Sequence, residues 1–317
     1  MKLWSDEIEA LRPEARAVVA AGIPLLTAAL DGGEVPDDPA EMLAFRRAAY
    51  SSRYVLSERA ADRDINGVRC RTFVPDGERT GVYLHFHGGG MILGDPEMND
   101  LGNEDLCTRF GLVVVSVDYR LAPEHPFPAG PDDGVAVARW VLENAASEWG
   151  VDRLLIGGES AGGYMVAAVL LRLRDELDAA DRVCGVNLVF GVHDWGLSPS
   201  QQGLRLSDSP DMLTPDGCAM FGDLYLPGTT RSERRSPHIS PLYADLRGLC
   251  PAFMSVGTAD HLLDDTLMLA PRWAAAGNEV ELFVAPDMPH GFMAFPCALT
   301  SAWLEAQNAW FARRLSA

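Results

Sequence analysis

Ser160 has the sequence surroundings of an enzyme nucleophile. It lies in a G-x-S-x-G pattern within residues 157–163, Gly-Gly-Glu-Ser-Ala-Gly-Gly. Residues 151–156 before this pattern predict a buried strand, and the apolar, alanine-rich residues 164–173 after it predict a helix. A serine at such a strand–turn–helix junction is held in a sharp turn that exposes its hydroxyl above the strand ends. The pattern therefore favours a nucleophilic serine over an incidental serine in a glycine-rich turn.

A serine hydroxyl needs a base before it can act as a nucleophile near neutral pH. Four histidines follow Ser160 in the chain: His193, His238, His261 and His290. His290 comes just past an expected strand at 280–284, and parallel sheets place their sites in the loops at the carboxyl ends of strands. We therefore expect His290 to be the base, and the other three histidines to be surface or hydrogen-bonded structural residues.

The base needs an acid to orient it, and in this kind of site the chain order is serine, acid, histidine. Asp260 is the first carboxylate past the expected strand at 252–256, so we favour it. Asp264 and Asp265 lie about one helical turn further on and are the runners-up. Asp287 is close to the expected base in sequence but sits on the same loop.

Three consecutive glycines, Gly88, Gly89 and Gly90, directly follow an expected strand at 81–86. Their N–H groups are unobstructed and can turn toward one point. Together with the N–H of Ala161, this arrangement suits an oxyanion hole. His85 and His87 flank Phe86 at a spacing that also occurs in metal sites, but no third ligand motif accompanies them, so we expect no metal.

The elements that would position these residues alternate from residue 68 onward. Strands are expected at 68–74, 81–86, 112–117, 151–156, 185–190, 252–256 and 280–284. Helices are expected at 132–148, 164–173, 267–276 and 302–315. This rhythm predicts an α/β fold with a mostly parallel sheet that is flanked by helices on both faces.

Two segments fall outside this rhythm. Residues 1–50 have a helical pattern, with loops at 32–33 and 36–39 and without a convincing strand. Residues 195–235 contain a helix at 215–226, which a threonine cap and a proline at its first position should start. We expect both segments to form a helical cap on a catalytic domain at 51–317. An ordinary crossover helix is the alternative for 215–226.

Composition narrows the class of protein. The chain has 317 residues and a net charge of −19, which disfavours nucleic acid and anionic membrane surfaces as partners. Its six cysteines show neither a C-x-x-C pair nor a zinc spacing, so free thiols in a reducing compartment are expected. The longest apolar stretch, residues 17–30, is too short to cross a bilayer, and the acidic start lacks the charge of a signal peptide. We expect a cytoplasmic protein without membrane insertion.

Three motifs together resemble the hormone-sensitive-lipase family of α/β-hydrolases. They are the glycine motif at 87–90, the serine motif at 158–163 and Asp-Tyr-Arg-Leu-Ala-Pro-Glu-His-Pro-Phe-Pro-Ala at 118–129. The resemblance runs from about residue 55 to the C-terminus and implies an α/β-hydrolase fold with carboxylesterase activity. It implies a catalytic triad of Ser160, Asp260 and His290, and oxyanion-hole amides from Gly88, Gly89 and Ala161. It also implies that His87 braces the glycine loop and that the 118–129 segment shapes the site from beneath.

The chain departs from the family pattern at three places. Glu159 stands where the family has Asp before the serine, and Asn99-Asp100 stands where it often has His-Asp. In the family's Asp-Pro-Leu-x-Asp motif, His261 replaces the proline, a change that bears on the hydrogen bonding of the neighbouring acid. None of these changes removes a catalytic group.

We therefore expect a serine carboxylesterase that hydrolyses short-to-medium acyl esters, about C2 to C8 by the family resemblance, through an acyl-enzyme intermediate. Its partner is a small-molecule ester, it needs no metal or organic cofactor, and a homodimer is left open. Amide hydrolysis, as in an amidase or deacetylase, and lactone hydrolysis with the same triad are the nearest alternatives. A non-catalytic ligand receptor on the same fold is a further one, but such receptors lose the histidine that His290 supplies here.

The substrate pocket should be lined by apolar residues near the glycine loop and on the 215–226 helix, because small-molecule sites are mostly apolar. The candidates are Met91, Ile92, Leu213, Phe221 and Tyr225. For Phe221 and Tyr225, packing of the cap against the core is the alternative role.

Overall fold

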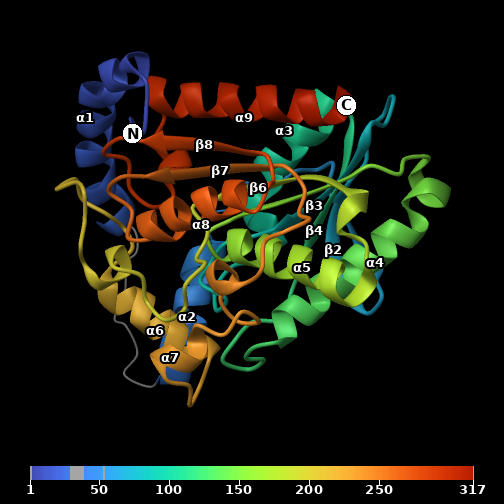
Figure 1. Cartoon of the computed structure of the whole chain (residues 1–317), viewed down its shortest axis with the longest axis horizontal. Coiled ribbons are helices and arrows are strands. Elements are labelled where there is room, and N and C mark those ends of the chain that lie inside the picture. The colour runs from blue at the N-terminus through green and yellow to red at the C-terminus, as the bar shows by residue number, and fades with distance from the viewer. Residues whose placement is uncertain (1, 29–38, 53, 317) are drawn as a thin grey trace.

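An eight-stranded sheet forms the centre of the computed structural model, which describes residues 2–28, 39–52 and 54–316 (Figure 1). The strand order is β1-β2-β4-β3-β5-β6-β7-β8. The β1–β2 and β2–β4 pairs are antiparallel, and the other neighbouring strands are parallel. The strands are β1 (Ala61–Ile65), β2 (Val68–Phe73), β3 (Gly81–Phe86), β4 (Leu112–Val117), β5 (Leu154–Glu159), β6 (Val183–Val189), β7 (Ala252–Gly257) and β8 (Val280–Ala285). The predicted α/β fold with a mostly parallel sheet is confirmed.

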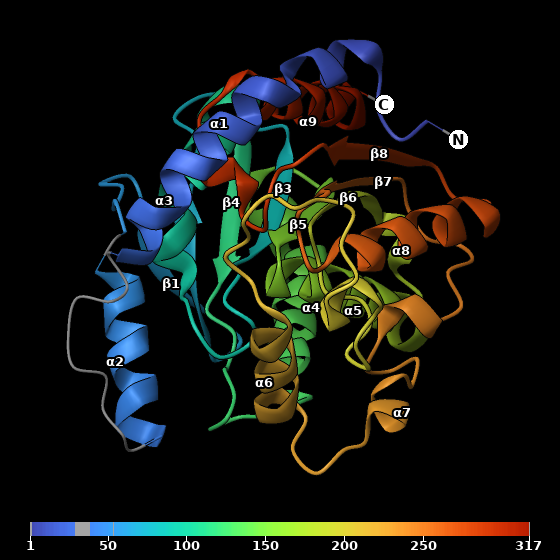
Figure 2. The same ribbon diagram turned by 90° about the vertical axis from the view of Figure 1, so that its left-hand side faces the viewer.

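Helices cover both faces of this sheet. The helices of the described residues are α1 (Asp6–Ala28), α2 (Pro39–Ser51), α3 (Asp100–Phe110), α4 (Ala129–Trp149), α5 (Ala161–Leu177), α6 (Pro215–Tyr225), α7 (Arg231–Arg234), α8 (Leu263–Ala275) and α9 (Ala298–Ser316). Figure 2 shows α1, α3 and α9 on one side of the sheet and α4, α5 and α8 on the other. Among the described residues, no helix combines the length and the apolar character that crossing a bilayer requires.

The two faces of the sheet carry two separate apolar clusters. In β3, Val82, Leu84 and Phe86 pack with the side chains of α4 and α5, whereas Tyr83 packs on the opposite face beside Phe311 of α9. This alternation follows from the twofold side-chain period of a strand. All six residues of β3, β4 and β7 are buried, as expected for strands covered on both sides. The strand ends that carry the candidate site are therefore fixed in a packed core.

The strand predictions at 81–86 and 112–117 match β3 and β4 residue for residue, and the other predicted strands differ only at their ends. Besides the single-turn helix α7 and the short 3₁₀ helices, two elements were not predicted. β1 (Ala-Asp-Arg-Asp-Ile) is a mostly exposed, charged strand at the edge of the sheet, where charge discourages pairing with another chain. The buried positions of α3 include Asp100 and Asn103, so the helix lacks the apolar stripe by which a sequence pattern is recognised.

The two segments expected to form a cap contact different parts of the molecule. Helix α1 packs through Ala15 and Val19 into the apolar cluster of α9. The guanidinium of Arg47, on α2, donates to the backbone carbonyl oxygens of Ile92 and Ala122 at 2.8 and 2.9 Å, just past the glycine loop. The expected loops at 32–33 and 36–39 lie outside the described residues, except that residue 39 is the first of α2. The division of the chain into cap and catalytic domain stays a prediction.

Helix α6 begins as its sequence predicts. The hydroxyl of Thr214 accepts the backbone N–H of Gly217 at 3.1 Å, and Pro215 occupies the first helical position. In Figure 1, α1, α2 and α6 all lie on the left-hand side of the sheet, the side that Figure 2 turns toward the viewer. We call residues 195–235 the cap segment from here on.

Candidate active site

Ser160 occupies a strained turn between β5 and α5. Its backbone has φ 58° and ψ −117°, a conformation that non-glycine residues rarely adopt. A Cβ added at Gly158 would lie 2.4 Å from the carbonyl oxygen of Phe86, and one at Gly162 would lie 1.9 Å from the same atom. Only glycine allows this approach, so the two glycines of the motif bring β5, α5 and the end of β3 together at the serine.

The structure brings Ser160, His290 and Asp260 into one hydrogen-bonded line. His290 Nε2 lies 2.8 Å from Ser160 Oγ, and His290 Nδ1 lies 2.8 Å from Asp260 Oδ2. Asp260 Oδ1 accepts the backbone N–H of Leu262 at 2.7 Å, which fixes the carboxylate. Asp260 follows β7 and His290 follows β8, so neighbouring parallel strands deliver the acid and the histidine to the same end of the sheet.

Burial and charge act in opposite directions on His290. Burial lowers the pKa of the imidazole, but the charge of Asp260, its hydrogen bond and the charge of Asp211 together raise the pKa above its ordinary value. Burial also disfavours the charged form of Asp260, which for a carboxyl group means a raised pKa. The charge of His290 and its hydrogen bond only partly offset that rise. The ring of Phe190 packs edge-on at 4.7 Å from His290 and shields one side of the pair from water. A positive charge that develops on His290 is therefore stabilised by a close carboxylate in apolar surroundings.

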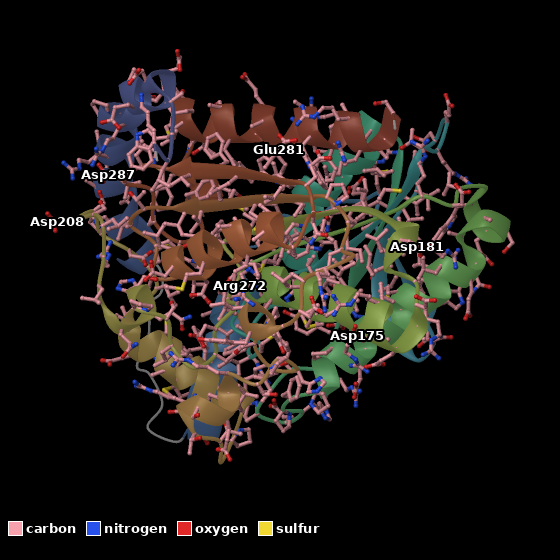
Figure 3. All side chains as sticks on the ribbon, in the orientation of Figure 1. Asp175, Asp181, Asp208, Arg272, Glu281 and Asp287 are labelled. Carbon is pink, nitrogen blue, oxygen red and sulfur yellow. The ribbon has the colours of Figure 1, made fainter. Side chains whose placement is uncertain are left out.

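The other candidate acids hold the surrounding loops. Asp265 accepts the backbone N–H groups of residues 193 and 194 and the side chains of Ser198 and Gln201. Asp264 accepts the N–H of Ser200 at 2.8 Å. Asp287 lies beside α1 (Figure 3), where its buried carboxylate pairs with the guanidinium groups of Arg12 and Arg16. None of the three contacts His290 through its side chain.

The remaining histidines also have other surroundings. His193 is buried, and burial lowers the pKa of its imidazole to about 3. His238 is exposed. His261 stands beside Asp260 in sequence, yet its Nδ1 lies 2.7 Å from a different carboxylate, Asp211 Oδ2.

The glycine loop runs directly past the serine. A Cβ on Gly88 would lie 3.5 Å from the Cβ of Ser160, and one on Gly89 (φ 114°) would lie 2.0 Å from the carbonyl oxygen of Leu93. Among the described residues, the N–H groups of Gly88 and Gly89 donate to no acceptor. The N–H of Ala161 is the first of α5, where backbone donors have no acceptor within the helix. These three amides are the ones that the sequence assigned to an oxyanion hole.

Two buried histidines lie near the serine, of which His87 contacts the glycine loop and His85 the residue before the serine. His87 Nδ1 lies 2.7 Å from the carbonyl oxygen of Gly88, and its ring stacks at 4.3 Å on Tyr119, whose hydroxyl donates to the His87 carbonyl. Burial lowers the pKa of His87 to about 3, so this imidazole is neutral. His85 Nε2 lies 3.1 Å from a carboxylate oxygen of Glu159, the residue that replaces the family's Asp before the serine.

The five residues expected in the substrate pocket lie in two kinds of surroundings. Phe221 of α6 lies against the glycine loop, where a Cβ on Gly90 would meet its ring at 2.7 Å. Tyr225 is buried on the same helix, and its hydroxyl donates to that of Tyr164 at 3.2 Å. Met91 and Ile92 are buried in the apolar cluster of α4 and α5, and Leu213 packs against that cluster, half-buried. Their roles in binding stay predictions.

Sequence reasoning missed one residue at this site, Asp211. It comes from the irregular part of the cap segment before α6, and its Oδ1 accepts the backbone N–H of His290 at 2.8 Å. Asp211 belongs to no motif and is 79 residues from its partner in sequence. The only available signal was the histidine at position 261, where the family pattern has proline.

The chain belongs to the α/β-hydrolase fold family, whose model matches residues 83–294, and within it to the hormone-sensitive-lipase group. It is 39% identical to a carboxylesterase of Mycobacterium tuberculosis, NlhH, over 231 residues that cover 70% of this chain and 69% of that protein. The esterase LipI of the same organism is 33% identical over 239 residues, which cover 74% of this chain and 72% of LipI. A crystal structure of a hormone-sensitive lipase from a metagenome library superposes with a TM-score of 0.80 at 33% identity, covering 94% and 98% of the two chains.

Proposed function

We propose that this chain is a serine carboxylesterase in which Ser160 is the nucleophile, His290 the general base and Asp260 the acid that orients it. The observation that carries the proposal is the position of the His290 imidazole, which contacts Ser160 on one ring nitrogen and Asp260 on the other at 2.8 Å each. A base within hydrogen-bond reach of the hydroxyl, and itself held by a third group, is the arrangement that activates a serine. The carboxylesterase and esterase names of the M. tuberculosis relatives support the same reaction.

In the acylation step, His290 Nε2 takes the Ser160 proton while Oγ forms a bond to the ester carbonyl carbon. The carbonyl electron pair moves to oxygen, and the N–H groups of Gly88, Gly89 and Ala161 stabilise the resulting anion. When the carbon–alkoxide bond breaks, His290 returns the proton to the leaving alcohol. A water molecule then repeats the sequence on the acyl-enzyme, which releases the acid and restores Ser160.

The acyl chains that we propose as substrates are short to medium, about C2 to C8, an expectation from the family resemblance. Phe221 supports this range because its ring lies against Gly90 and occupies space beside the proposed oxyanion hole. The half-buried Leu213 just before α6 gives the same side of the site an apolar wall, which suits an acyl chain. The molecule acted on is a small ester.

We also propose that the protein works in a reducing, cytoplasmic environment. Its six cysteines are free, and five of them are buried. Burial raises the pKa of the Cys70 thiol to about 12, so this thiol stays protonated and unreactive. Localisation of a fluorescent fusion in intact cells tests this proposal.

A panel of p-nitrophenyl esters from acetate to palmitate, with an aryl amide and a lactone alongside, tests the function. The proposal expects turnover of the short esters, slower turnover with increasing chain length, and loss of the activity in Ser160→Ala. Hydrolysis of the amide or the lactone at a higher kcat/KM than any ester would contradict the ester assignment. Binding without turnover of any substrate would favour the receptor alternative.

A further inference from the structure

Asp211 connects the cap segment to the two loops that carry the proposed acid and base. Its Oδ1 accepts the backbone N–H of His290 at 2.8 Å. Its Oδ2 accepts the ring Nδ1 of His261 at 2.7 Å and the backbone N–H of His261 at 3.2 Å. The side chain of Asp211 is only 1% exposed. A cap residue is thus bonded to the main chain of the histidine that performs the proton transfer.

A buried carboxylate is costly unless donors surround it, and here residue 261 supplies two of the four donors, the others being the backbone N–H groups of Met212 and His290. The family pattern has proline at this position, which offers neither a backbone N–H nor a side-chain donor. The histidine that replaces proline at position 261 therefore supplies two of the hydrogen-bond donors that the buried Asp211 carboxylate requires. Asp211 and His261 form a second carboxylate–imidazole pair beside the Asp260–His290 pair.

The charged and polar groups around the His290 imidazole come from three elements. Ser160 faces it from the serine turn and Asp260 from the loop after β7, while Asp211 faces it from the cap segment. The ring of Phe190, from the loop after β6, is the apolar neighbour.

Two further charged groups lie near the Asp260–His290 pair without facing the His290 imidazole. Asp287, on the His290 loop, is paired with Arg12 and Arg16 of α1. Arg205, the cation of the cap segment in this region, donates to the backbone carbonyl oxygens of Ser209 and Ala259.

We propose that Asp211 is a positioning residue for the base. Its carboxylate holds the His290 backbone from the cap side and places a second negative charge near the imidazolium that forms when Ser160 is deprotonated. His261 keeps this carboxylate oriented and hydrogen-bonded. The proposal rests on the proposed serine esterase function and adds to it a contribution of the cap to proton transfer.

The sign of the expected pH effect follows from the charges. Burial alone would lower the pKa of His290, and the charges of Asp260 and Asp211 both raise it. The base must be neutral to accept the serine proton, so the acid limb of the kcat/KM profile reports its pKa in the free enzyme. Removing the Asp211 charge lowers the pKa of His290, which moves this limb to lower pH and extends activity into more acidic solution.

The test compares Asp211→Asn with Asp287→Asn by pH profiles of kcat/KM for a short p-nitrophenyl ester. The amide oxygen of Asp211→Asn can still accept the His290 N–H, so this variant removes the charge and keeps that bond, while its NH2 group no longer accepts from His261. Its acid-limb midpoint should move to lower pH, whereas Asp287→Asn removes a buried charge from the same loop and should keep the wild-type midpoint. Asp211→Ala also loses the acceptor, and kcat should fall by about 10²-fold, the cost of a misplaced catalytic group.

An unchanged midpoint in an active Asp211→Asn enzyme would overturn the inference, since a merely structural residue changes rates without moving the midpoint. If Asp211→Asn does not fold, His261→Leu decides the question. This variant removes the ring donor and leaves the Asp211 charge less compensated, so the midpoint should move to higher pH, and an unchanged midpoint would overturn the inference. Wild-type activity in Ser160→Ala would instead overturn the proposed function, which keeps the two failures distinct.

Discussion

The two sides of the candidate site are held in place by different interactions. On the strand side, glycine backbone packs against backbone, as where Gly162 leaves no room for a Cβ beside Phe86. On the cap side, residues 203–214 form no helix or strand, expose Leu204 and Leu206, and reach the site through polar side chains such as Asp211. On this account the strand side fixes the proposed reacting groups, and the cap side contacts them through hydrogen bonds of single side chains.

Loss of the proposed nucleophile, which belongs to the strand side, should have the largest effect on activity. Ser160→Ala should lower kcat by on the order of 10⁶, because the serine and its base act as one unit. The free energy of unfolding should change little, since among the described residues the Ser160 hydroxyl bonds only to His290. Near wild-type turnover, measured on protein free of wild-type contamination, would end the triad proposal.

The next effect separates the carboxylates. Asp260→Asn should reduce kcat by about 10⁴, as when a triad acid is lost and the histidine is left in the wrong tautomer. Asp264→Asn and Asp287→Asn serve as controls because their carboxylates hold Ser200 and the α1 arginines rather than the base. Steady-state kinetics of the three variants would refute the assignment if Asp264→Asn proved the most damaging.

The packing of the strand side predicts a large effect on stability. Gly162→Ala should lower the free energy of unfolding by about 3 kcal/mol, because its Cβ would meet a rigid backbone carbonyl. Gly102→Ala is the matched control in α3, where no atom lies within 4 Å of the added Cβ. It should raise stability by about 0.5–1 kcal/mol through helix propensity. Urea denaturation measures the free energy of unfolding of both variants. Equal changes in the two would show that the backbone around residue 162 can move to accommodate a Cβ.

The smallest effect concerns the cap side. Phe221→Ala should change the ratio of octanoate to acetate hydrolysis in favour of the longer chain by about tenfold, the size of effect that one pocket group has on selectivity. Leu224→Ala on the same helix packs against the core cluster and should leave the ratio unchanged. If Phe221→Ala lowers stability without altering the ratio, its ring only packs α6 against the glycine loop.

Most of the strand side could be predicted from sequence because its constraints are local. The run at 157–163 and the glycines at 88–90 encode a turn and a loop that only glycine permits, and strand order places Asp260 and His290 at the same sheet end. Asp211 could not be found in this way. Its partners lie 50 and 79 residues further along the chain, and its segment has no periodicity that would fix its place in space.

Helix α3 and strand β1 were missed for a related reason. The buried face of α3 mixes polar contacts, such as the bidentate pair of Asp100 with Arg71, with apolar packing by Cys107 and Phe110, so its apolar stripe is interrupted. β1 is a charged edge strand with no apolar alternation in its sequence, and its pairing with β2 is seen only in the structure. Apolar periodicity thus identifies the central sheet and leaves its polar surroundings undetermined.

Covalent labelling of the wild-type enzyme tests the central claim most directly. An organophosphate that phosphorylates activated serines should add one adduct per chain, located by peptide mass spectrometry on Ser160, with parallel loss of p-nitrophenyl ester hydrolysis. His290→Ala should label far more slowly at the same pH, because the serine then lacks its base. An adduct on any other residue that accompanies the loss of activity, or full activity in protein labelled at Ser160, would contradict the account.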